Sequence, residues 1–363
     1  MSNRFGHIFN ISIFGESHGP GIGVVIDGLP PGIKIEYDYI NTELKRRRPG
    51  KSKLATSRDE ADEFEFLSGI KNGYTSGASI CAIIRNTDSH SKDYGNIINH
   101  PRPSHSDYPA SIKYNNYNDI NGGGQFSGRL TAPVVLAGAI AKSILNDYKI
   151  KILERIKSVY QYEDIKLDYS KISLSDFTFS DPDFPVLDDK AEKNMKEAIL
   201  HAKDTKDSLG GIVECFSFGL PVGLGEPLYD NLDSRIAGAI LNIPSVKAIE
   251  FGRGFDSTKL KGSQNNDHYY YDKGVKTRTN NHGGILAGMA TGMPLVFSAA
   301  IKPTASIGIG QETINLQTHE SYELTIDGRH DPCIVPRALV VIEAWTSLVL
   351  LDMMILGGYY GNL

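Results

Sequence analysis

Short apolar segments separated by polar, glycine-containing loops predict that the chain contains both strands and helices. Seven segments are short enough for strands, and they cover residues 11–14, 22–26, 79–84, 150–161, 207–218, 246–251 and 295–301. Four segments have the length and composition of helices, and they cover residues 132–145, 188–204, 231–241 and 337–356. The last of these is almost uniformly apolar, so we expect it to be buried.

The order of these elements favours an α+β fold. Helices and strands alternate without the regular βαβ spacing of a doubly wound parallel sheet. There is neither an internal repeat nor a linker at which the chain could be divided, so we expect residues 1–363 to form a single domain. Residues 262–281 are polar and aromatic and are interpreted as a flexible loop or lid, and Cys81 is expected to be a small core residue.

The composition is that of an ordinary globular protein, with 40% hydrophobic and 22% charged residues. A net charge of −5 argues against a general nucleic-acid binder. We expect no apolar run of the roughly 20 residues that span a membrane, and the N-terminus does not resemble a signal peptide. Cys81, Cys215 and Cys333 are far apart, which suggests neither a disulfide framework nor a metal site. A cytoplasmic location is therefore expected.

Glycine is unusually frequent, at 37 of 363 residues. Its clusters lie in residues 15–32, 122–128, 210–225, 283–292 and 308–310. Loops with special backbone geometry that converge on one site would explain these clusters. Many tight turns in a β-rich fold would explain them equally well.

The stretch from Arg102 to Lys142 combines several features of an anion site. It contains His105, the triple glycine 122–124 and Arg129, and it leads into the helix predicted at 132–145. We expect Thr131 to cap that helix and Pro133 to lie near its first position. Open glycine backbone beside a helix N-terminus suits a phosphate or another anion. A flexible turn is the alternative, and the G-x-G-x-x-G pattern fails because Ser127 occupies the position of the third glycine.

Other loops carry cations and hydroxyls. Residues 45–58 contain seven positive charges and no acid, and residues 59–65 then contain five acids. Such a run is typical of a solvated face or a weak nucleic-acid patch, but on an acidic chain it better suits a small polyanion. Residues 302–306 place a lysine before two hydroxyl residues, which also suits phosphate. His18 lies in a glycine-flanked turn and is either a surface residue or a catalyst.

Taken together, the loops resemble those of the chorismate synthase family. The resemblance rests on short motifs that occur in the family's order over nearly the full chain. They are Gly15-Glu-Ser-His-Gly19, Gly28 to Ile33, Arg46 to Gly50, Arg102-Pro-Ser-His-Ser-Asp107, Gly122 to Gly124, Ser127 to Arg129, Gly225 to Pro227, Val246 to Gly254, Lys302-Pro303 and Arg329 to Cys333.

This resemblance implies a phosphate lyase of the shikimate pathway. Members of the family convert 5-enolpyruvylshikimate-3-phosphate to chorismate by a 1,4-anti elimination that needs reduced FMN without net redox change. The implied fold is a β-α-β sandwich with long central helices between antiparallel sheets, assembled as a homotetramer. We expect no nucleic acid, membrane or metal as a partner. NAD(P)H would act only through an external flavin reductase.

The resemblance also implies roles for individual residues. His18 would be the acid for phosphate departure, His105 would protonate the flavin, and Asp331 would help to remove the C6 hydrogen of the substrate. The implied FMN contacts are Gln125, Phe126, Ser127, Pro244, Ser245, Ala287, Lys302, Pro303, Thr304, Ala305, Ser306 and Arg329. The implied contacts to substrate or NADP phosphate are Arg47, Arg48, Lys53, Arg129 and Arg337.

The chain departs from the family pattern in three places. Gln125-Phe126-Ser127 replaces a common arginine-serine-serine, Ala287 replaces a common glycine, and serines flank His105. Two other functions remain open at this stage. One is a flavin oxidoreductase that uses NAD(P)H directly, although no nicotinamide domain is evident. The other is a non-enzymatic phospholigand-binding protein, in which the histidines would be dispensable.

Overall fold

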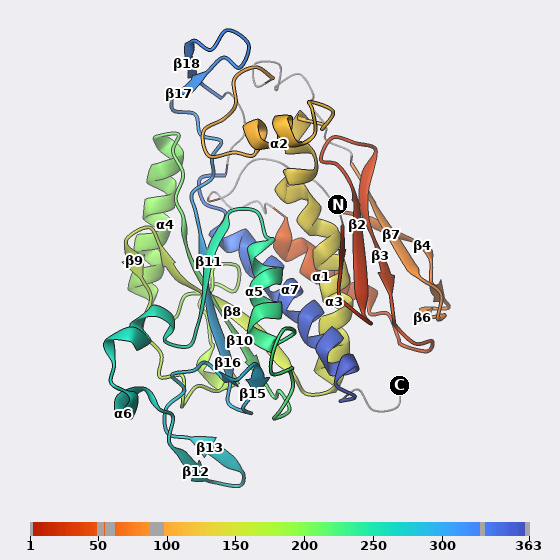
Figure 1. Ribbon diagram of the computed structural model, residues 1–363, viewed down its shortest axis with the longest axis vertical. Coiled ribbons are helices and arrows are strands. Elements are labelled where there is room, and N and C mark those ends of the chain that lie inside the picture. The colour runs from red at the N-terminus through yellow and green to blue at the C-terminus, as the bar shows by residue number, and fades with distance from the viewer. Residues whose placement is uncertain (1–2, 49–53, 55–61, 87–97, 327–330, 360–363) are drawn as a thin grey trace.

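The structure is a computed structural model that describes residues 3–48, 54, 62–86, 98–326 and 331–359. Two antiparallel five-stranded sheets lie on either side of a layer of helices (Figure 1). The predicted α+β class and the β-α-β sandwich are therefore confirmed.

The first sheet is formed by the N-terminal strands, in the order β1-β2-β3-β7-β4. Their bounds are β1 (Arg4–Phe5), β2 (Asn10–Gly15), β3 (Gly21–Asp27), β7 (Ile80–Arg85) and β4 (Phe64–Ser68). The second sheet has the order β11-β16-β10-β8-β9. Its bounds are β11 (Val246–Phe251), β16 (Leu295–Ile301), β10 (Gly211–Phe218), β8 (Lys151–Val159) and β9 (Tyr162–Glu163).

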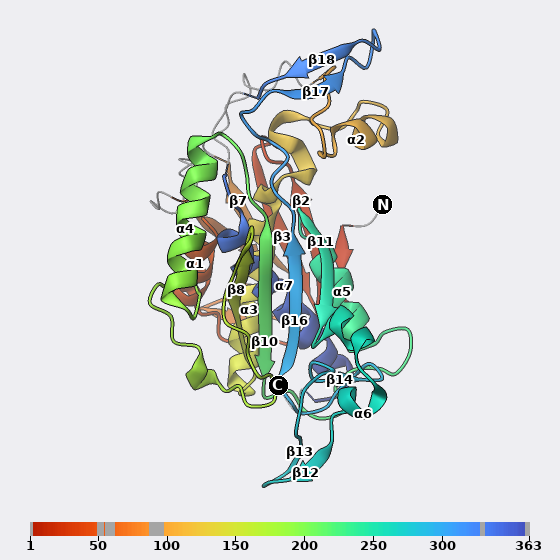
Figure 2. The same ribbon diagram turned by 90° about the vertical axis from the view of Figure 1, so that its left-hand side faces the viewer.

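Helices α1, α3, α5 and α7 lie between the two sheets, α2 lies at one end of the long axis, and α4 lies beside β9 (Figures 1 and 2). The helices are α1 (Tyr37–Arg47), α2 (Asp107–Lys113), α3 (Thr131–Asp147), α4 (Asp189–Asp204), α5 (Leu232–Leu241), α6 (Gly262–Asn265) and α7 (Val335–Leu356). The remaining strands form small hairpins, β5 (Ile70–Lys71) with β6 (Tyr74–Thr75), β12 (Tyr269–Tyr271) with β13 (Val275–Thr277), β14 (Ile285–Leu286) with β15 (Met289–Ala290), and β17 (Gln311–Ile314) with β18 (Ser321–Leu324).

The two longest helices of the layer, α3 and α7, pack directly against each other. A Cβ on Gly138 would lie 2.4 Å from the Cβ of Ala344, so only glycine allows the helices to approach this closely. Together with the 3₁₀ turn before α3, these helices are long and apolar enough to cross a membrane, contrary to the sequence expectation. Both helices are mostly buried between the sheets. Burial in the core of a globular fold also accounts for helices that are apolar on all sides.

Two local predictions are wrong. Thr131 is the first residue of α3 and caps nothing; a 3₁₀ turn at Gly128–Leu130 precedes it, and its hydroxyl donates to the carbonyl of Gly128. Cys81 is only half-buried, because alternate residues of β7 face the helix layer and Cys81 faces the other way. Residues 262–281, interpreted as a flexible loop or lid, contain α6 and the β12–β13 hairpin.

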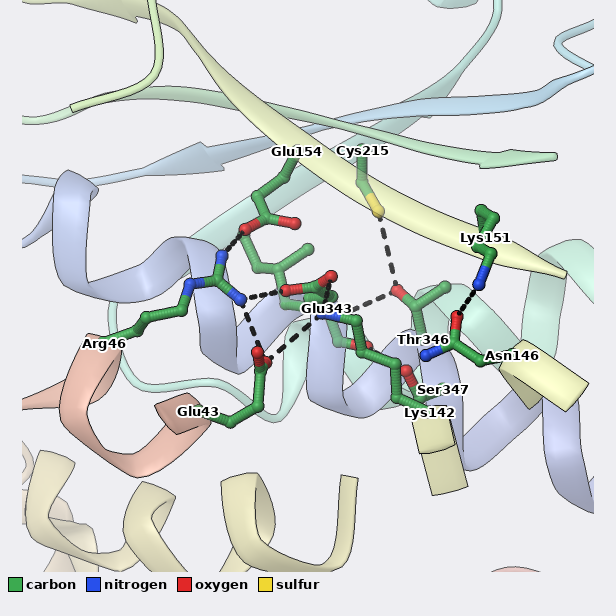
Figure 3. A network of polar contacts seen from close by, with 11 residues as sticks. Glu43, Arg46, Lys142, Asn146, Lys151, Glu154, Cys215, Glu343, Thr346 and Ser347 are labelled. Atoms are coloured by element: carbon green, nitrogen blue, oxygen red, sulfur yellow. Dashed lines mark hydrogen bonds and ion pairs between the residues drawn. The ribbon is translucent and has the colours of Figure 1, made fainter. Parts of the chain in front are cut away.

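The helix layer contains a set of five charged side chains, which we call the buried charge cluster (Figure 3). Its members are Glu43 and Arg46 of α1, Lys142 of α3, Glu154 of β8 and Glu343 of α7. Arg46 Nη1 lies 2.9 Å from Glu43 Oε2 and 2.6 Å from Glu343 Oε2, and Arg46 Nη2 pairs with Glu154. Lys142 Nζ lies 3.3 Å from Glu43 Oε2 and also pairs with Glu343. The cluster therefore joins three helices to the second sheet.

The buried charge cluster would have one excess negative charge if all five groups were ionised. Burial and repulsion from Glu343 raise the pKa of Glu154 to about 8, against the attraction of Arg46 and Lys142. Burial alone would also raise the pKa of Glu343, but attraction to Lys142 and Arg46 outweighs it and lowers that pKa. Glu154 is thus the carboxyl that holds a proton at neutral pH, and this proton balances the cluster.

We predict that Glu154→Gln removes a component of the pH dependence of stability. The pKa of Glu154 rises from 4.5 to about 8 on folding. The contribution of this group to the free energy of unfolding is therefore fully present below pH 4.5, and it is lost as the pH rises through 8. The loss amounts to about 1.4 kcal/mol per pH unit at most. Glutamine imitates the protonated carboxyl, so the variant should gain stability relative to the wild type as pH rises.

Urea unfolding between pH 5 and pH 8.5 measures this difference. The control is Glu65→Gln, which removes an exposed carboxylate of β4 and should change stability by no more than about 0.5 kcal/mol at any pH. A constant difference between Glu154→Gln and the wild type over this range would contradict the prediction.

Candidate functional site

The triple glycine contacts both histidines that the sequence singled out. Gly122, Gly123 and Gly124 have φ angles of +58°, +84° and +51°, which favour glycine. A Cβ on Gly122 would lie 2.0 Å from Cε1 of His18 and 2.1 Å from its Nδ1. A Cβ on Gly123 would lie 3.8 Å from both Cε1 and Nε2 of His105. Residues almost ninety positions apart in the sequence are thus brought together by one loop.

His105 is held by charged neighbours from its own motif. Its Nδ1 lies 2.5 Å from Asp107 Oδ1 and 3.0 Å from Arg102 Nη2. Arg102 also donates from Nε and Nη2 to the two oxygens of Asp107, over 2.7 Å and 2.8 Å. Burial alone would raise the pKa of Asp107, but hydrogen bonds from Arg102 and His105 hold it well below its usual range. Asp107 is therefore a carboxylate.

The segment 302–306 follows β16 and lies against the His105 loop. Lys302 Nζ donates to the carbonyl of Ser104 over 2.7 Å, and Ser306 Oγ accepts from Arg102 Nη1 over 3.1 Å. The backbone N–H of Lys302 donates to the carbonyl of Ser245 over 2.9 Å, which brings the predicted contact pair 244–245 to the same place. Burial and the nearby Lys247 lower the pKa of Lys302, so this corner is electropositive.

Three of the predicted arginines are held by two carboxylates. Asp62 lies between Arg47 and Arg129: Arg47 Nε donates to Oδ2 over 3.1 Å, and Arg129 pairs with Oδ1. Arg337 Nε donates to the carbonyl of Arg47 over 3.1 Å, and Arg337 Nη1 pairs with Asp331. Burial lowers the pKa of Arg47, and repulsion from Arg337 and Arg129 lowers it further against the attraction of Asp62. The three guanidinium groups are therefore crowded.

Asn86 connects the arginines to the His18 loop. Its Oδ1 accepts from Arg129 Nε over 3.1 Å, and its Nδ2 donates to the carbonyls of Glu16 and Gly19 over 3.0 Å and 2.8 Å. On the other side, Thr304 Oγ1 donates to the carbonyl of Asp331 over 3.1 Å. These links close a circuit of contacts, which we call the contact ring. Its members, in order, are His18, Asn86, Arg129, Asp62, Arg47, Arg337, Asp331, residues 302–306, Arg102, His105 and Gly122–Gly123.

Other predicted residues lie beside the ring. Gln125, Phe126 and Ser127 are half-buried and follow the triple glycine directly, and Ser127 Oγ accepts from the backbone N–H of Arg129 over 3.3 Å. The Phe126 ring lies 6.2 Å from that of Tyr114. Arg48 follows Arg47, and its buried Nε has no hydrogen-bond partner among the described residues.

One predicted flavin contact lies elsewhere. Ala287 is exposed in the turn between β14 and β15, at the end of the molecule opposite α2 (Figures 1 and 2). Its φ angle is +48°, which explains why a glycine would also suit the position. Lys53 and Arg329 lie outside the described residues. Glycines of two clusters meet near Ala287, since a Cβ on Gly225 would lie 2.3 Å from the carbonyl oxygen of Gly288.

Sequence reasoning gave no role to several members of the ring. Asp62 belongs to an acidic run, and the sequence does not distinguish it from the other acids of that run. Asn86 carries no sequence signal. Arg102 and Asp107 delimit the motif that contains His105, and their spacing of five residues could have suggested a pair that orients the histidine.

The charge of the ring suits an anionic ligand. Arg47, Arg129 and Arg337 against Asp62 and Asp331 leave one excess positive charge. Lys302 has no carboxylate partner in the part of the chain that the structure describes. Arginine and lysine donors arranged in this way bind phosphate and carboxylate groups.

Known proteins resemble this chain over almost its whole length. A model of the chorismate synthase family matches residues 9–355. A chorismate synthase of Dehalococcoides mccartyi is 44% identical over 359 residues, which covers 99% of this chain and 98% of the relative. One from Methanocaldococcus jannaschii is 43% identical over 373 aligned positions, with the same coverage of 99% and 98%. A crystal structure of a chorismate synthase superimposes with a TM-score of 0.73 at 28% identity, covering 97% of this chain and 92% of that one.

We predict that Asp62→Asn destabilises the protein and that phosphate partly restores its stability. The substitution leaves Arg47 and Arg129 buried without their shared carboxylate, which should cost roughly 3–5 kcal/mol. An anion that binds these arginines in the folded state would offset that cost. The midpoint of thermal unfolding should therefore rise more with added phosphate in the variant than in the wild type.

The exposed Glu65→Gln again provides the control, because it removes a neighbouring acid without touching the ring. If phosphate stabilised all three proteins equally, the arginines would not form its binding site.

Proposed function

The chain belongs to the chorismate synthase family, and on this premise we propose that it uses reduced FMN to form chorismate from 5-enolpyruvylshikimate-3-phosphate. The family consists of lyases that catalyse the last common step of the shikimate pathway, a 1,4-anti elimination of phosphate. The observation that supports the proposal most strongly is the contact ring, which joins the two histidines, Asp331 and the arginines.

The arginines of the ring would bind the anionic groups of the substrate. The substrate carries a phosphate and two carboxylates, and guanidinium groups recognise both in bidentate fashion. The repulsion among Arg47, Arg129 and Arg337 favours this, because an anion between them relieves it. Arg48 offers a buried Nε without a partner among the described residues, and Lys53 is kept as a substrate contact on the resemblance alone.

His18, His105 and Asp331 would handle protons. In this proposal His18 donates a proton to the departing phosphate, and Asp331 takes part in removing the C6 hydrogen. His105 holds a proton on the cofactor side of the site. Imidazole suits both tasks because it titrates near neutral pH. Arg337, paired with Asp331, would hold that carboxyl in place beside the substrate.

The ring also has groups that fit a flavin mononucleotide. The ammonium of Lys302 and the hydroxyls of Thr304 and Ser306 are donors for a phosphate, and Ser245 contacts the backbone of Lys302. Gln125 to Ser127 follow the triple glycine, which contacts His105. When bound, reduced FMN supplies electrons to the elimination and regains them, so there is no net redox change. Arg329 and Ala287 remain proposed contacts, although Ala287 lies at the other end of the chain's fold.

The remaining proposals concern the protein as a whole. We propose that residues 1–363 form a single catalytic domain, supported by one hydrophobic core that runs through both sheets and the helix layer. By family resemblance the protein would work in the cytoplasm as a homotetramer. NAD(P)H would serve only as the source of electrons for an external flavin reductase.

Anaerobic turnover assays test the cofactor proposal. Chorismate should form with dithionite-reduced FMN, and should not form with NADPH plus oxidised FMN unless a flavin reductase is added. Turnover in the NADPH mixture without a reductase would show that the enzyme reduces its own flavin. Absence of chorismate in both mixtures would reject the proposed function.

We predict that Gly122→Ala inactivates the enzyme by displacing His18. The new Cβ would overlap the imidazole, at 2.0 Å from Cε1, so the ring must move from its place in the site. If His18 is the general acid, kcat should fall by roughly 10²–10⁴.

Gly123→Ala is the matched control. It also places alanine at a positive φ, but its Cβ would make only ordinary contacts, with the nearest atom 3.8 Å away. It should share the backbone cost of about 1–2 kcal/mol and lose clearly less of kcat than Gly122→Ala, because it leaves His18 in place. Equal losses in the two variants would mean that the backbone, and not His18, is responsible.

A further inference from the structure

The Nδ1 atom of His105 has two charged groups within hydrogen-bond distance. Asp107 Oδ1 is 2.5 Å away and Arg102 Nη2 is 3.0 Å away. All three side chains are largely enclosed, with exposed fractions of 21% for His105, 11% for Asp107 and 6% for Arg102. The nitrogen can donate to the carboxylate or accept from the guanidinium, but one ring nitrogen cannot do both.

The surrounding bonds decide between these possibilities. Arg102 already donates to both oxygens of Asp107 in a two-pronged pair, and its backbone N–H donates to Oδ2 over 3.0 Å. Asp107 is thereby kept ionised and can only accept. A carboxylate oxygen 2.5 Å from a ring nitrogen requires a proton between them, so Nδ1 carries the hydrogen. The pairing of Arg102 with Asp107 does not depend on Nδ1, because Nε and one N–H of Nη2 already donate to the carboxylate.

We propose that Asp107 is a positioning residue that keeps the proton of neutral His105 on Nδ1 and leaves Nε2 as the nitrogen that exchanges protons. This inference rests on the proposed function, in which His105 handles a proton beside the cofactor. Nε2 lies on the side of the triple glycine, since a Cβ on Gly123 would lie 3.8 Å from it. The ring can therefore present only this nitrogen to a ligand on that side.

Among the described residues, no other charged group lies within hydrogen-bond distance of Nδ1. Lys302 bonds the carbonyl of Ser104 and not the ring, and Ser306 bonds Arg102. His18 lies across Gly122 from the same loop. Ser106 Oγ is 3.5 Å from Nδ1, at the limit of a hydrogen bond. Among these neighbours, Asp107 alone accepts strongly from Nδ1.

The decisive variant is Asp107→Asn. Asparagine keeps the shape, but its amide can donate to Nδ1 and so favour the tautomer with hydrogen on Nε2. We expect long-range ¹H–¹⁵N spectra of the full-length enzyme to show His105 with hydrogen on Nδ1 in the wild type and on Nε2 in the variant. We expect kcat to fall by roughly 10²–10⁴, with KM for the substrate changed by less than about threefold. Ser106→Ala, which removes only the distant hydroxyl, should match the wild type in both measurements.

The outcomes separate the inference from the proposed function. A wild-type spectrum that shows the hydrogen on Nε2 would overturn the inference, and this result needs neither a variant nor an activity assay. A tautomer that changes in Asp107→Asn while kcat stays the same would also overturn it, because the orientation would then have no consequence for the reaction. A wild-type enzyme with the expected tautomer that makes no chorismate would instead reject the proposed function and leave the assigned tautomer standing.

Discussion

The fold and the site both depend on how α1 is held by the buried charge cluster. Arg46 binds carboxylates from α1 itself, β8 and α7, and Lys142 of α3 completes the set (Figure 3). A buried cation that lost its partners would be strongly unfavourable, so this cluster allows only one placement of α1 in the helix layer. The next residue, Arg47, then reaches Asp62 and, through it, Arg129. The proton on Glu154 matters here because it makes the cluster neutral.

From α1 outwards, the site is made by loops at the ends of antiparallel strands. The β2–β3 turn supplies His18, the end of β7 leads to Asn86, and the end of β16 leads to residues 302–306. The triple glycine lies where these loops meet, and its missing side chains allow the two imidazoles to approach the same backbone. Rigid sheets with catalytic groups on their connecting loops are a common arrangement in enzymes. Here the loops are additionally tied to one another by hydrogen bonds and ion pairs, which form the contact ring.

Much of the fold could be predicted from local patterns, and most of the ring could not. Strands Val246–Phe251 and Leu295–Ile301 were predicted with both ends correct, because proline and glycine delimit their apolar segments. Cys81 was misplaced because both faces of β7 are apolar, which hides the alternation. The charges of the buried cluster are typical of surface residues, and only the tertiary structure shows that they pair. The same holds for Asp62 and Asn86. The resemblance assigned roles to the histidines and arginines, but it does not indicate which partners orient them.

Because Arg46 and Arg47 are adjacent, the number of residues in α1 cannot change without loss of ion pairs. Successive residues of an α-helix point about 100° apart, so one turn of α1 directs one arginine into the core and the next toward the site. An insertion of a single residue within α1 would rotate both side chains together and remove both sets of ion pairs at once. In the β12–β13 hairpin, by contrast, the exposed strands can absorb a longer turn without reaching the core. Insertions and deletions should therefore be absent from α1 and tolerated in the hairpin. Among related chains, a segment that never varies in length would be one that is tied to the buried charge cluster.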